Sequence, residues 1–523
     1  MTTLDAPEGL ASPVGAARIA ELTRLVRSTT GTSRTARSPI TGEGFAEIPQ
    51  SDPDDVEEAF RIARRTQTSW AQTSLRERKR ALLRLHDLLL ERQDELMDIV
   101  QLETGKSRFD AFGEVLHLAL TARYYGRRLH RQLRPSHPSG VFPGLTSIEL
   151  RRVPKGVVGI ISPWNYPLTV ALCDGLPALA AGNTVVHKPD AQTPLSALAA
   201  VELLREAGFP ADAWQVVLGD GPVVGGAIVQ RADYICFTGS TATGRLVAQG
   251  AAERLVGCSL ELGGKNAMIV LPGADLGKAA AGALAACFST AGQLCVSVER
   301  LYVPAEAYDA FSDELLARVR TMSLGVGFDW DPDMGSLVSQ QQLDAVSRHV
   351  DDAVAHGATV LAGGVPRPDL GPWFYEPTVL EDVPPTAQLY AGETFGPVVS
   401  LYPYRDVDEA VELANAGEYG LNASVWGPVR EAKAVAARIK AGTVNINEGY
   451  AGTFASVDAP MGGMRQSGLG RRQGDEGIWR YTESQSVAVQ RLLPITGPAS
   501  MARERYAGLV TTSLKILRRT PRA

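Results

Sequence analysis

Cys295 occupies a junction in the sequence that suits a nucleophile. It follows Gly292 and Gln293 at the end of a helical pattern, and a strand pattern follows over residues 297–303. A glycine at such a junction lets the backbone approach a ligand closely. Only the thiolate attacks a carbonyl carbon, so a nearby base or positive dipole must first remove the thiol proton. Most of the other four cysteines have the apolar surroundings typical of inert buried thiols.

Two more side chains could serve the same reaction centre. Asn165 can offer its amide, together with the backbone N–H of Cys295, to a developing oxyanion, and one such donor is typically worth about 3 kcal/mol. Glu261 ends the apolar run 258–260, where desolvation raises a carboxyl pKa toward neutrality and suits a general base. Taken singly, Asn165 is also typical of a turn, and Glu261 of an ion pair with Lys265 or an arginine.

A third feature is the glycine-flanked segment 239–244, which lies between a strand pattern and a helical pattern. Its form is G-x-x-x-x-G, which differs from the usual G-x-G-x-x-G of dinucleotide-binding proteins. Ser240 can cap the following helix, which leaves helix N–H groups free to meet a pyrophosphate. The position of the segment therefore favours a phosphate contact, although the G-x-x-x-x-G motif alone is weak support.

A parallel sheet would bring these residues together. Short apolar runs at 156–161, 183–187, 214–218, 234–237 and 259–262 alternate with helix-length segments such as 193–208 and 240–252. Strands buried on both faces and separated by helices indicate a parallel α/β sheet. A second alternating block covers about 266–447. In such sheets the chemistry collects in loops at the carboxyl ends of the strands, and each motif follows an apolar run.

The N-terminal part of the chain shows a different pattern. Residues 1 to about 50 look like a loose polar lead-in. Amphipathic periodicity then predicts helices over 54–70, from a Ser74 cap through Leu102, and over about 111–133. The Pro/Ser/Gly stretch 135–144 ends the third helix.

In this order, the motifs resemble the aldehyde dehydrogenase superfamily from about residue 35 to 490. The motifs are Ser162–Pro167, His187–Asp190, Thr238–Gly244, Glu261–Lys265, Gly292–Cys295 and Glu393–Pro397. Each motif alone is weak, but the set, with Glu261 and Cys295 separated by 34 residues, is highly specific. The resemblance implies that Cys295 adds to an aldehyde, that Asn165 holds the alkoxide, and that Glu261 activates the water that hydrolyses the thioester.

The resemblance also implies a nicotinamide dinucleotide site. Ser240 would meet the phosphates, Trp164 and Lys188 the adenosine ribose, and Glu393 and Phe395 the nicotinamide ribose. His187 is interpreted as structural, and no metal is implied. The complete set of implied cofactor contacts is Trp164, Asn165, Lys188, Pro189, Asp190, Ala191, Gly239, Ser240, Leu262, Glu393 and Phe395.

The residue three positions after Lys188 bears on the choice of cofactor. NAD-preferring members of the family often have a glutamate there, whose carboxylate would repel a 2′-phosphate, whereas this chain has Ala191. A small neutral residue beside Lys188 admits the phosphate. We therefore expect NADP as the cofactor, with NAD as the alternative.

Within the superfamily, the chain most resembles bacterial NADP-dependent succinate-semialdehyde dehydrogenases, and the segment 461–468 is typical of an actinobacterial branch. One departure matters. Two arginines clamp the substrate carboxylate in better-known members, and their positions hold Ser289 and Cys173 here. Without a bidentate partner for the carboxylate, either another group such as Arg465 or Ser456 substitutes, or the substrate is a broader range of aliphatic or aromatic aldehydes.

Two other classes of protein share this scaffold. A CoA-acylating dehydrogenase has the same fold and cysteine but commonly lacks the base, so Glu261 favours hydrolysis. A non-catalytic binding protein is the second alternative, and the joint presence of Cys295, Glu261 and Asn165 speaks against it.

Composition narrows the partners and the compartment. The chain has 523 residues and a mild net charge of −6, which argues against nucleic acid as a main partner. Five cysteines, an odd number, are typical of a reduced intracellular protein, and we expect the cytoplasm. We find neither a signal-peptide pattern nor an apolar run of membrane-spanning length.

The predicted architecture is α/β and aldehyde dehydrogenase-like. We expect a Rossmann-type dinucleotide-binding domain over 1–135 and 155–264 and a catalytic domain over 265–465. A β oligomerisation arm would pair 136–154 with 481–492, in a homodimer or homotetramer. The tail 493–523 is basic, and we expect it to be solvated or packed on another subunit, with contact to a membrane surface as the alternative.

Overall fold

The computed structural model describes residues 2–3, 13–141, 146–325, 327–491 and 494–518. The chain divides into two compact units, which we describe separately. The first comprises Met1–Gln132 and Pro154–Tyr481, and the second comprises Leu133–Val153 and Thr482–Ala523. None of the described helices combines the length and the apolar character needed to cross a membrane.

The first sheet of the larger unit is the predicted parallel sheet. Its six strands run in the order β18-β9-β8-β5-β6-β7, and only the short β18 is antiparallel. The runs of buried apolar residues form these strands because helices cover both faces. The strands are β5 Val157–Ile161, β6 Thr184–Lys188, β7 Trp214–Val216, β8 Tyr234–Thr238, β9 Gly257–Glu261 and β18 Gly468–Leu469.

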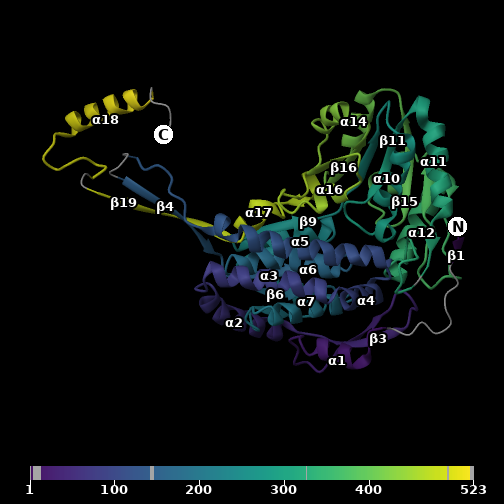
Figure 1. Cartoon of the computed structure of the whole chain (residues 1–523), viewed down its shortest axis with the longest axis horizontal. Coiled ribbons are helices and arrows are strands. Elements are labelled where there is room, and N and C mark those ends of the chain that lie inside the picture. Colours follow the sequence, from purple (N-terminus) through teal and green to yellow (C-terminus); the bar gives the residue numbers. More distant parts are fainter. Residues whose placement is uncertain (1, 4–12, 142–145, 326, 492–493, 519–523) are drawn as a thin grey trace. The chain divides into compact units, whose positions relative to one another are not determined.

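Helices surround this sheet (Figure 1). All of α6 is buried, including its polar Thr169 and Asp174. Ser74 caps α3, as predicted, and it forms a capping box with Glu77. The helices are α2 Pro53–Trp70, α3 Leu75–Glu91, α4 Gln93–Thr104, α5 Arg108–Leu133, α6 Pro167–Ala180, α7 Pro194–Glu206, α8 Gly226–Val229 and α9 Thr241–Glu253.

Two of the local predictions are wrong. The helix expected from Ser74 through Leu102 is two helices, because Arg92 leaves helical geometry (φ −107°, ψ 18°) while its guanidinium binds Glu95 in the next turn. The N-terminal region is not a loose lead-in, because α1 (Ala16–Thr23), β2 (Ser33–Arg37) and β3 (Gly44–Pro49) pack on the body. Leu22 and Ile48 are fully buried.

The second sheet has seven strands in the order β13-β14-β15-β11-β10-β16-β17, and β13 alone is antiparallel. They are β10 Asn266–Val270, β11 Val298–Pro304, β13 Thr359–Ala362, β14 Thr378–Glu381, β15 Val398–Tyr404, β16 Asn422–Trp426 and β17 Thr443–Ile446. Their flanking helices are α10 Leu276–Phe288, α11 Tyr308–Thr321, α12 Gln340–Ala355, α13 Gln388–Ala391, α14 Val407–Asn415 and α15 Val429–Ala436.

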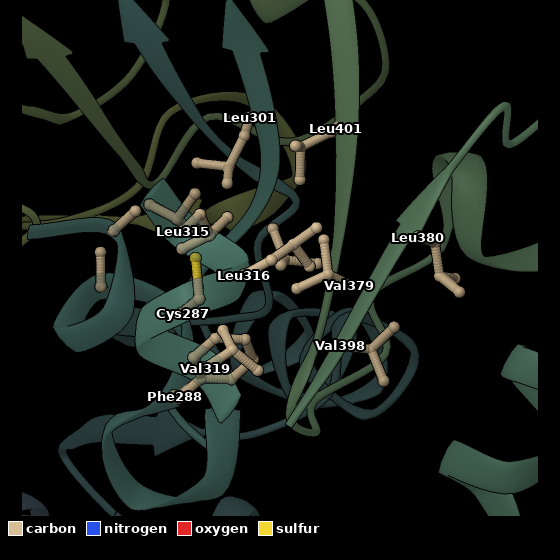
Figure 2. Packing of buried hydrophobic residues seen from close by; sticks show 14 of the residues in the cluster. Cys287, Phe288, Leu301, Leu315, Leu316, Val319, Val379, Leu380, Val398 and Leu401 are labelled. Carbon is tan, nitrogen blue, oxygen red and sulfur yellow. The ribbon is translucent and has the colours of Figure 1, made fainter. Parts of the chain in front are cut away.

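A large apolar core fixes the end of α10, just ahead of the predicted nucleophile. Figure 2 shows Cys287 and Phe288 packed with Leu315 and Val319 of α11 and with Leu301 of β11. Burial raises the pKa of the Cys287 thiol, which agrees with an inert cysteine. This packing fixes the C-terminal end of α10, from which the chain continues toward Cys295.

The smaller unit contains β4 (Thr146–Pro154) and β19 (Thr482–Gln490), which pair as a two-stranded sheet. Most of β19 is exposed. The basic tail forms the helix α18 (Arg503–Leu517), in which no residue is buried. The larger unit also contains the smaller elements β1 Thr2–Thr3, which pairs with β12 Ser323–Leu324, and the helices α16 Ala451–Phe454 and α17 Gly474–Trp479.

Candidate active site

A cavity of about 240 Å³ lies where the first sheet meets the chain that leads into β11. We call it the central cavity. The three predicted catalytic residues, Asn165, Glu261 and Cys295, all line it. Besides Asn165, which is also a predicted cofactor contact, six more of the residues predicted to bind cofactor line it, namely Trp164, Gly239, Ser240, Leu262, Glu393 and Phe395. Loops from separate strands therefore converge as predicted.

The backbone around Cys295 is held in an unusual conformation. Thr290, Ala291 and Gly292 all have positive φ angles (54°, 53° and 68°), which costs about 1–2 kcal/mol for each non-glycine residue. A side chain at Gly292 would overlap the carbonyl oxygen of Gly396. Asn266 Nδ2 donates to the Cys295 carbonyl at 2.8 Å, which fixes the half-buried cysteine at the cavity wall.

Hydrogen bonds fix both the side chain and the backbone of Asn165. Its side-chain Nδ2 donates to the Gln293 carbonyl at 2.9 Å, which leaves the second N–H of the amide for another acceptor. Its backbone carbonyl accepts a hydrogen bond from Lys106 Nζ at 2.8 Å. Lys106 also pairs with Glu114 at 2.7 Å, and Glu114 accepts from the backbone N–H of Leu168 at the start of α6. This buried chain of contacts orients the amide.

Glu261 ends β9 and is only 5% exposed. Its Oε1 atom has no hydrogen-bond partner among the described residues. Burial raises the pKa of the Glu261 carboxyl to about 7, and the charge of Arg472 opposes the rise. The carboxyl therefore titrates in the range where a general base is effective.

Burial also raises the pKa of the predicted nucleophile. It raises the pKa of the Cys295 thiol to about 12, the nearby Glu393 and Glu261 raise it further, and Arg472 lowers it. The thiol is therefore protonated at neutral pH in the free protein, so attack requires an acceptor for its proton.

Arg472 is a residue of the cavity wall that the sequence did not single out. Its Nε and Nη2 atoms bind the two oxygens of Asp174 at 2.9 and 2.8 Å, and Nη2 also donates to Thr238 at 2.9 Å. A second arginine, Arg480, binds the same carboxylate. No spacing signal could have found this cluster, because its members come from α6, β8 and the segment after β18.

The residues of the central cavity that are predicted to bind the cofactor include both polar and aromatic side chains. Ser240 caps α9 by accepting from Thr243 N at 3.3 Å. Glu393 Oε1 accepts from Gly264 N at 2.8 Å, and a side chain at Gly263 would overlap the other oxygen of Glu393. The rings of Trp164 and Phe395 meet edge to face at 5.5 Å. The exposed N-terminus of α9 is suited to the phosphates of a dinucleotide. The Glu393 carboxylate, which packs against two glycines, lines the same cavity.

Four predicted cofactor residues do not line the central cavity: Lys188, which ends β6, and Pro189, Asp190 and Ala191, which follow it. The Lys188 side chain is buried, and burial lowers its pKa while the charges of Asp190 and Asp220 raise it. The roles of these four residues in cofactor binding stay predictions.

The candidates for carboxylate binding lie apart from one another. Arg465 is exposed and donates to the carbonyls of Asn415 and Gly417 at 2.8 and 2.9 Å, away from the central cavity. Cys173 is buried and contacts Thr121 Oγ1 at 3.6 Å. Ser456 is exposed and lines a second hollow. The central cavity therefore contains neither replacement candidate.

Known proteins resemble this chain over most of its length. Residues 25–487 match the Aldehyde dehydrogenase family. A Mycolicibacterium smegmatis protein, provisionally named succinate-semialdehyde dehydrogenase [NADP(+)], is 50% identical over 94% of this chain and 95% of its own. An E. coli NADP-dependent enzyme is 34% identical with a TM-score of 0.85, over 89% of this chain and 96% of its own. An aldehyde dehydrogenase from Bacillus cereus, solved with NAD+, is 35% identical with a TM-score of 0.85, over 89% and 94% of the two chains. The chain belongs to the aldehyde dehydrogenase family.

Proposed function

We propose that the protein oxidises succinate semialdehyde to succinate with NADP as cofactor. The observation that supports this most is that Cys295, Asn165 and Glu261 line one cavity together with an exposed helix N-terminus at Ser240. That combination supports the assignment of a nucleophile, an oxyanion donor, a base and a phosphate site to a single space.

The reaction begins at the Cys295 thiol. Because the thiol is protonated in the free protein, its proton first passes to solvent water, and the thiolate then adds to the carbonyl carbon of the aldehyde. The negative charge moves to the carbonyl oxygen, where the free N–H of the Asn165 amide and the backbone N–H of Cys295 stabilise the alkoxide. Gln293, which binds the other N–H of that amide, fixes its direction.

The alkoxide then collapses and expels hydride, which leaves a thioester on Cys295. A bound nicotinamide ring supplies the acceptor for that hydride. Glu261 removes a proton from a water molecule, the hydroxyl oxygen attacks the thioester carbon, and the Cys295 sulfur leaves as the carboxylic acid forms. The pKa of about 7 lets Glu261 both accept and release protons near neutral pH.

The preference for NADP rests on charge. Ala191 in place of an acidic residue removes a repulsion toward a 2′-phosphate. Lys188 and Arg34 both contribute positive charge in this region, since Arg34 lowers the pKa of Lys188 through its charge. The names of the M. smegmatis relative and the E. coli structure support the same cofactor.

The proposal also covers the domain roles, the oligomeric state and the location of the protein. The first sheet and its helices would bind the dinucleotide (1–135 and 155–264), and the second would carry the catalytic loop (265–465). The β4–β19 pair (136–154 and 481–492) would form an oligomerisation arm of a homodimer or homotetramer, because the exposed strand β19 can receive a partner. We propose a cytoplasmic location and no nucleic-acid partner.

The test is a set of specificity constants for succinate semialdehyde, hexanal and benzaldehyde, each with NAD and with NADP. We expect the highest kcat/KM for succinate semialdehyde with NADP, and acid as the product without added coenzyme A. A preference for hexanal or benzaldehyde would instead indicate the broad-specificity enzyme. Cys295→Ala should abolish oxidation while Cys258→Ala, a matched half-buried cysteine, should not. Activity in Cys295→Ala would refute the mechanism.

A further inference from the structure

A second hollow, of about 610 Å³, lies between α5 and the segment 455–458. We call it the arginine hollow. Its polar lining consists of Arg123, Tyr124, Arg127, Arg128, Ser456 and Asp458. Arg128 pairs with Asp458 at 3.0 Å. Arg123 and Arg127 are exposed and form no ion pair with any residue that the structure describes. The hollow therefore keeps two uncompensated positive charges.

The arginine hollow and the central cavity share a wall. Phe454 lines the central cavity, and the next two residues, Ala455 and Ser456, line the hollow. On α5, the ring of His117 lies against the ring of Phe454, with centroids 4.3 Å apart and planes tilted by 31°, and Leu120, one helical turn later, lines the hollow.

Helix α6 continues the same wall. Val170 lines the central cavity, and Cys173, one turn later, contacts Thr121 of α5 at 3.6 Å. Val170 and Phe454 therefore connect the lining of the central cavity to α5 and to the segment that lines the arginine hollow.

The central cavity itself offers no cation for the far end of an anionic substrate. Among its described lining residues, the only cationic side chain is Arg472. Asp174 and Thr238 occupy the Nε and Nη2 atoms of Arg472. Arg472 also affects the pKa of Glu261 through its charge, so it belongs to the reacting end of the cavity.

We propose that the arginine hollow binds the carboxylate of ω-carboxyl aldehydes through Arg123 and Arg127 while the aldehyde group reaches Cys295. Guanidinium groups are suited to this because their parallel N–H donors match the two carboxylate oxygens. The hollow also raises the local concentration of anionic substrates, an effect that salt weakens. The inference rests on the proposed aldehyde oxidation and narrows its substrate class.

The test is the double variant Arg123→Gln/Arg127→Gln. The matched control is Arg131→Gln, since Arg131 is also exposed on α5 but pairs with Asp475 and does not line the hollow. The substrates are succinate semialdehyde and the six-carbon ω-carboxyl aldehyde, compared with butanal and hexanal. We expect the double variant to lose about tenfold in kcat/KM for the two anions at low salt and nothing for the neutral aldehydes. The wild-type preference for anions should shrink as salt is added.

Equal losses for anionic and neutral aldehydes, or no loss for the anions, would overturn the inference. A separate measurement does not depend on catalysis: calorimetric titration of the wild type with succinate should show binding that the double variant loses and Arg131→Gln keeps. Equal succinate binding by all three proteins would also overturn the inference. Normal oxidation of hexanal by the wild type would show that the proposed reaction survives such a failure.

Discussion

Replacing Glu261 by glutamine should separate the two halves of the reaction. Glutamine keeps the shape of the side chain but cannot accept a proton, so thioester hydrolysis should slow by about 10²–10⁴-fold. In the wild type, a pKa of about 7 means that about a tenth of Glu261 is ionised at pH 6 and about nine tenths at pH 8. Hydrolysis should therefore rise by about an order of magnitude over this interval, and the variant should lose that dependence.

Rapid mixing of enzyme, aldehyde and cofactor measures both steps. We expect the variant to give one equivalent of reduced cofactor in a burst, because hydride transfer precedes hydrolysis, followed by a slow steady rate. Mass spectrometry should detect the acyl group on Cys295. A steady rate within a few-fold of the wild type would refute the assignment of Glu261 as the base. So would a wild-type rate of hydrolysis that is flat between pH 6 and 8.

Three further predictions follow from the same site. Arg472→Met should move the midpoint of the pH–rate profile upward, because Arg472 lowers the pKa of Glu261; Arg472→Lys should restore it, and an unmoved midpoint would contradict the role. Lys106→Met should lower kcat more than it raises KM, since Lys106 holds the backbone of Asn165, and steady-state kinetics would show the split. Because the folded state holds the Glu261 proton more tightly than the unfolded state, unfolding free energy should fall by about 3 kcal/mol as pH rises from 4.5 to about 7. Glu261→Gln should therefore melt higher than the wild type at pH 8 in a thermal scan, and a lower melting temperature would contradict the buried charge.

Much of the first sheet could be predicted because each strand carries its own signal. The apolar runs at 156–161 and 234–237 became β5 and β8 with ends shifted by no more than one residue. The loop residues Asn165 and Glu261 follow or end such runs, so their places at the carboxyl edge follow from local sequence. The N-terminal fifty residues lacked that signal, since β2 is largely exposed, β3 is only partly buried, and both gain order by packing on the body.

The sequence alone determined the types of residue at the reaction centre and the order in which the strands present them, because burial on both faces and helix capping leave local patterns. Only the tertiary structure decided the charges around that centre. Asp174, Thr238 and Arg472 come from three distant segments, and the pairing of β18 with β9 leads into the segment that places Arg472 beside Glu261. Electrostatic effects depend on distance and burial in space, and no spacing along the chain records either one.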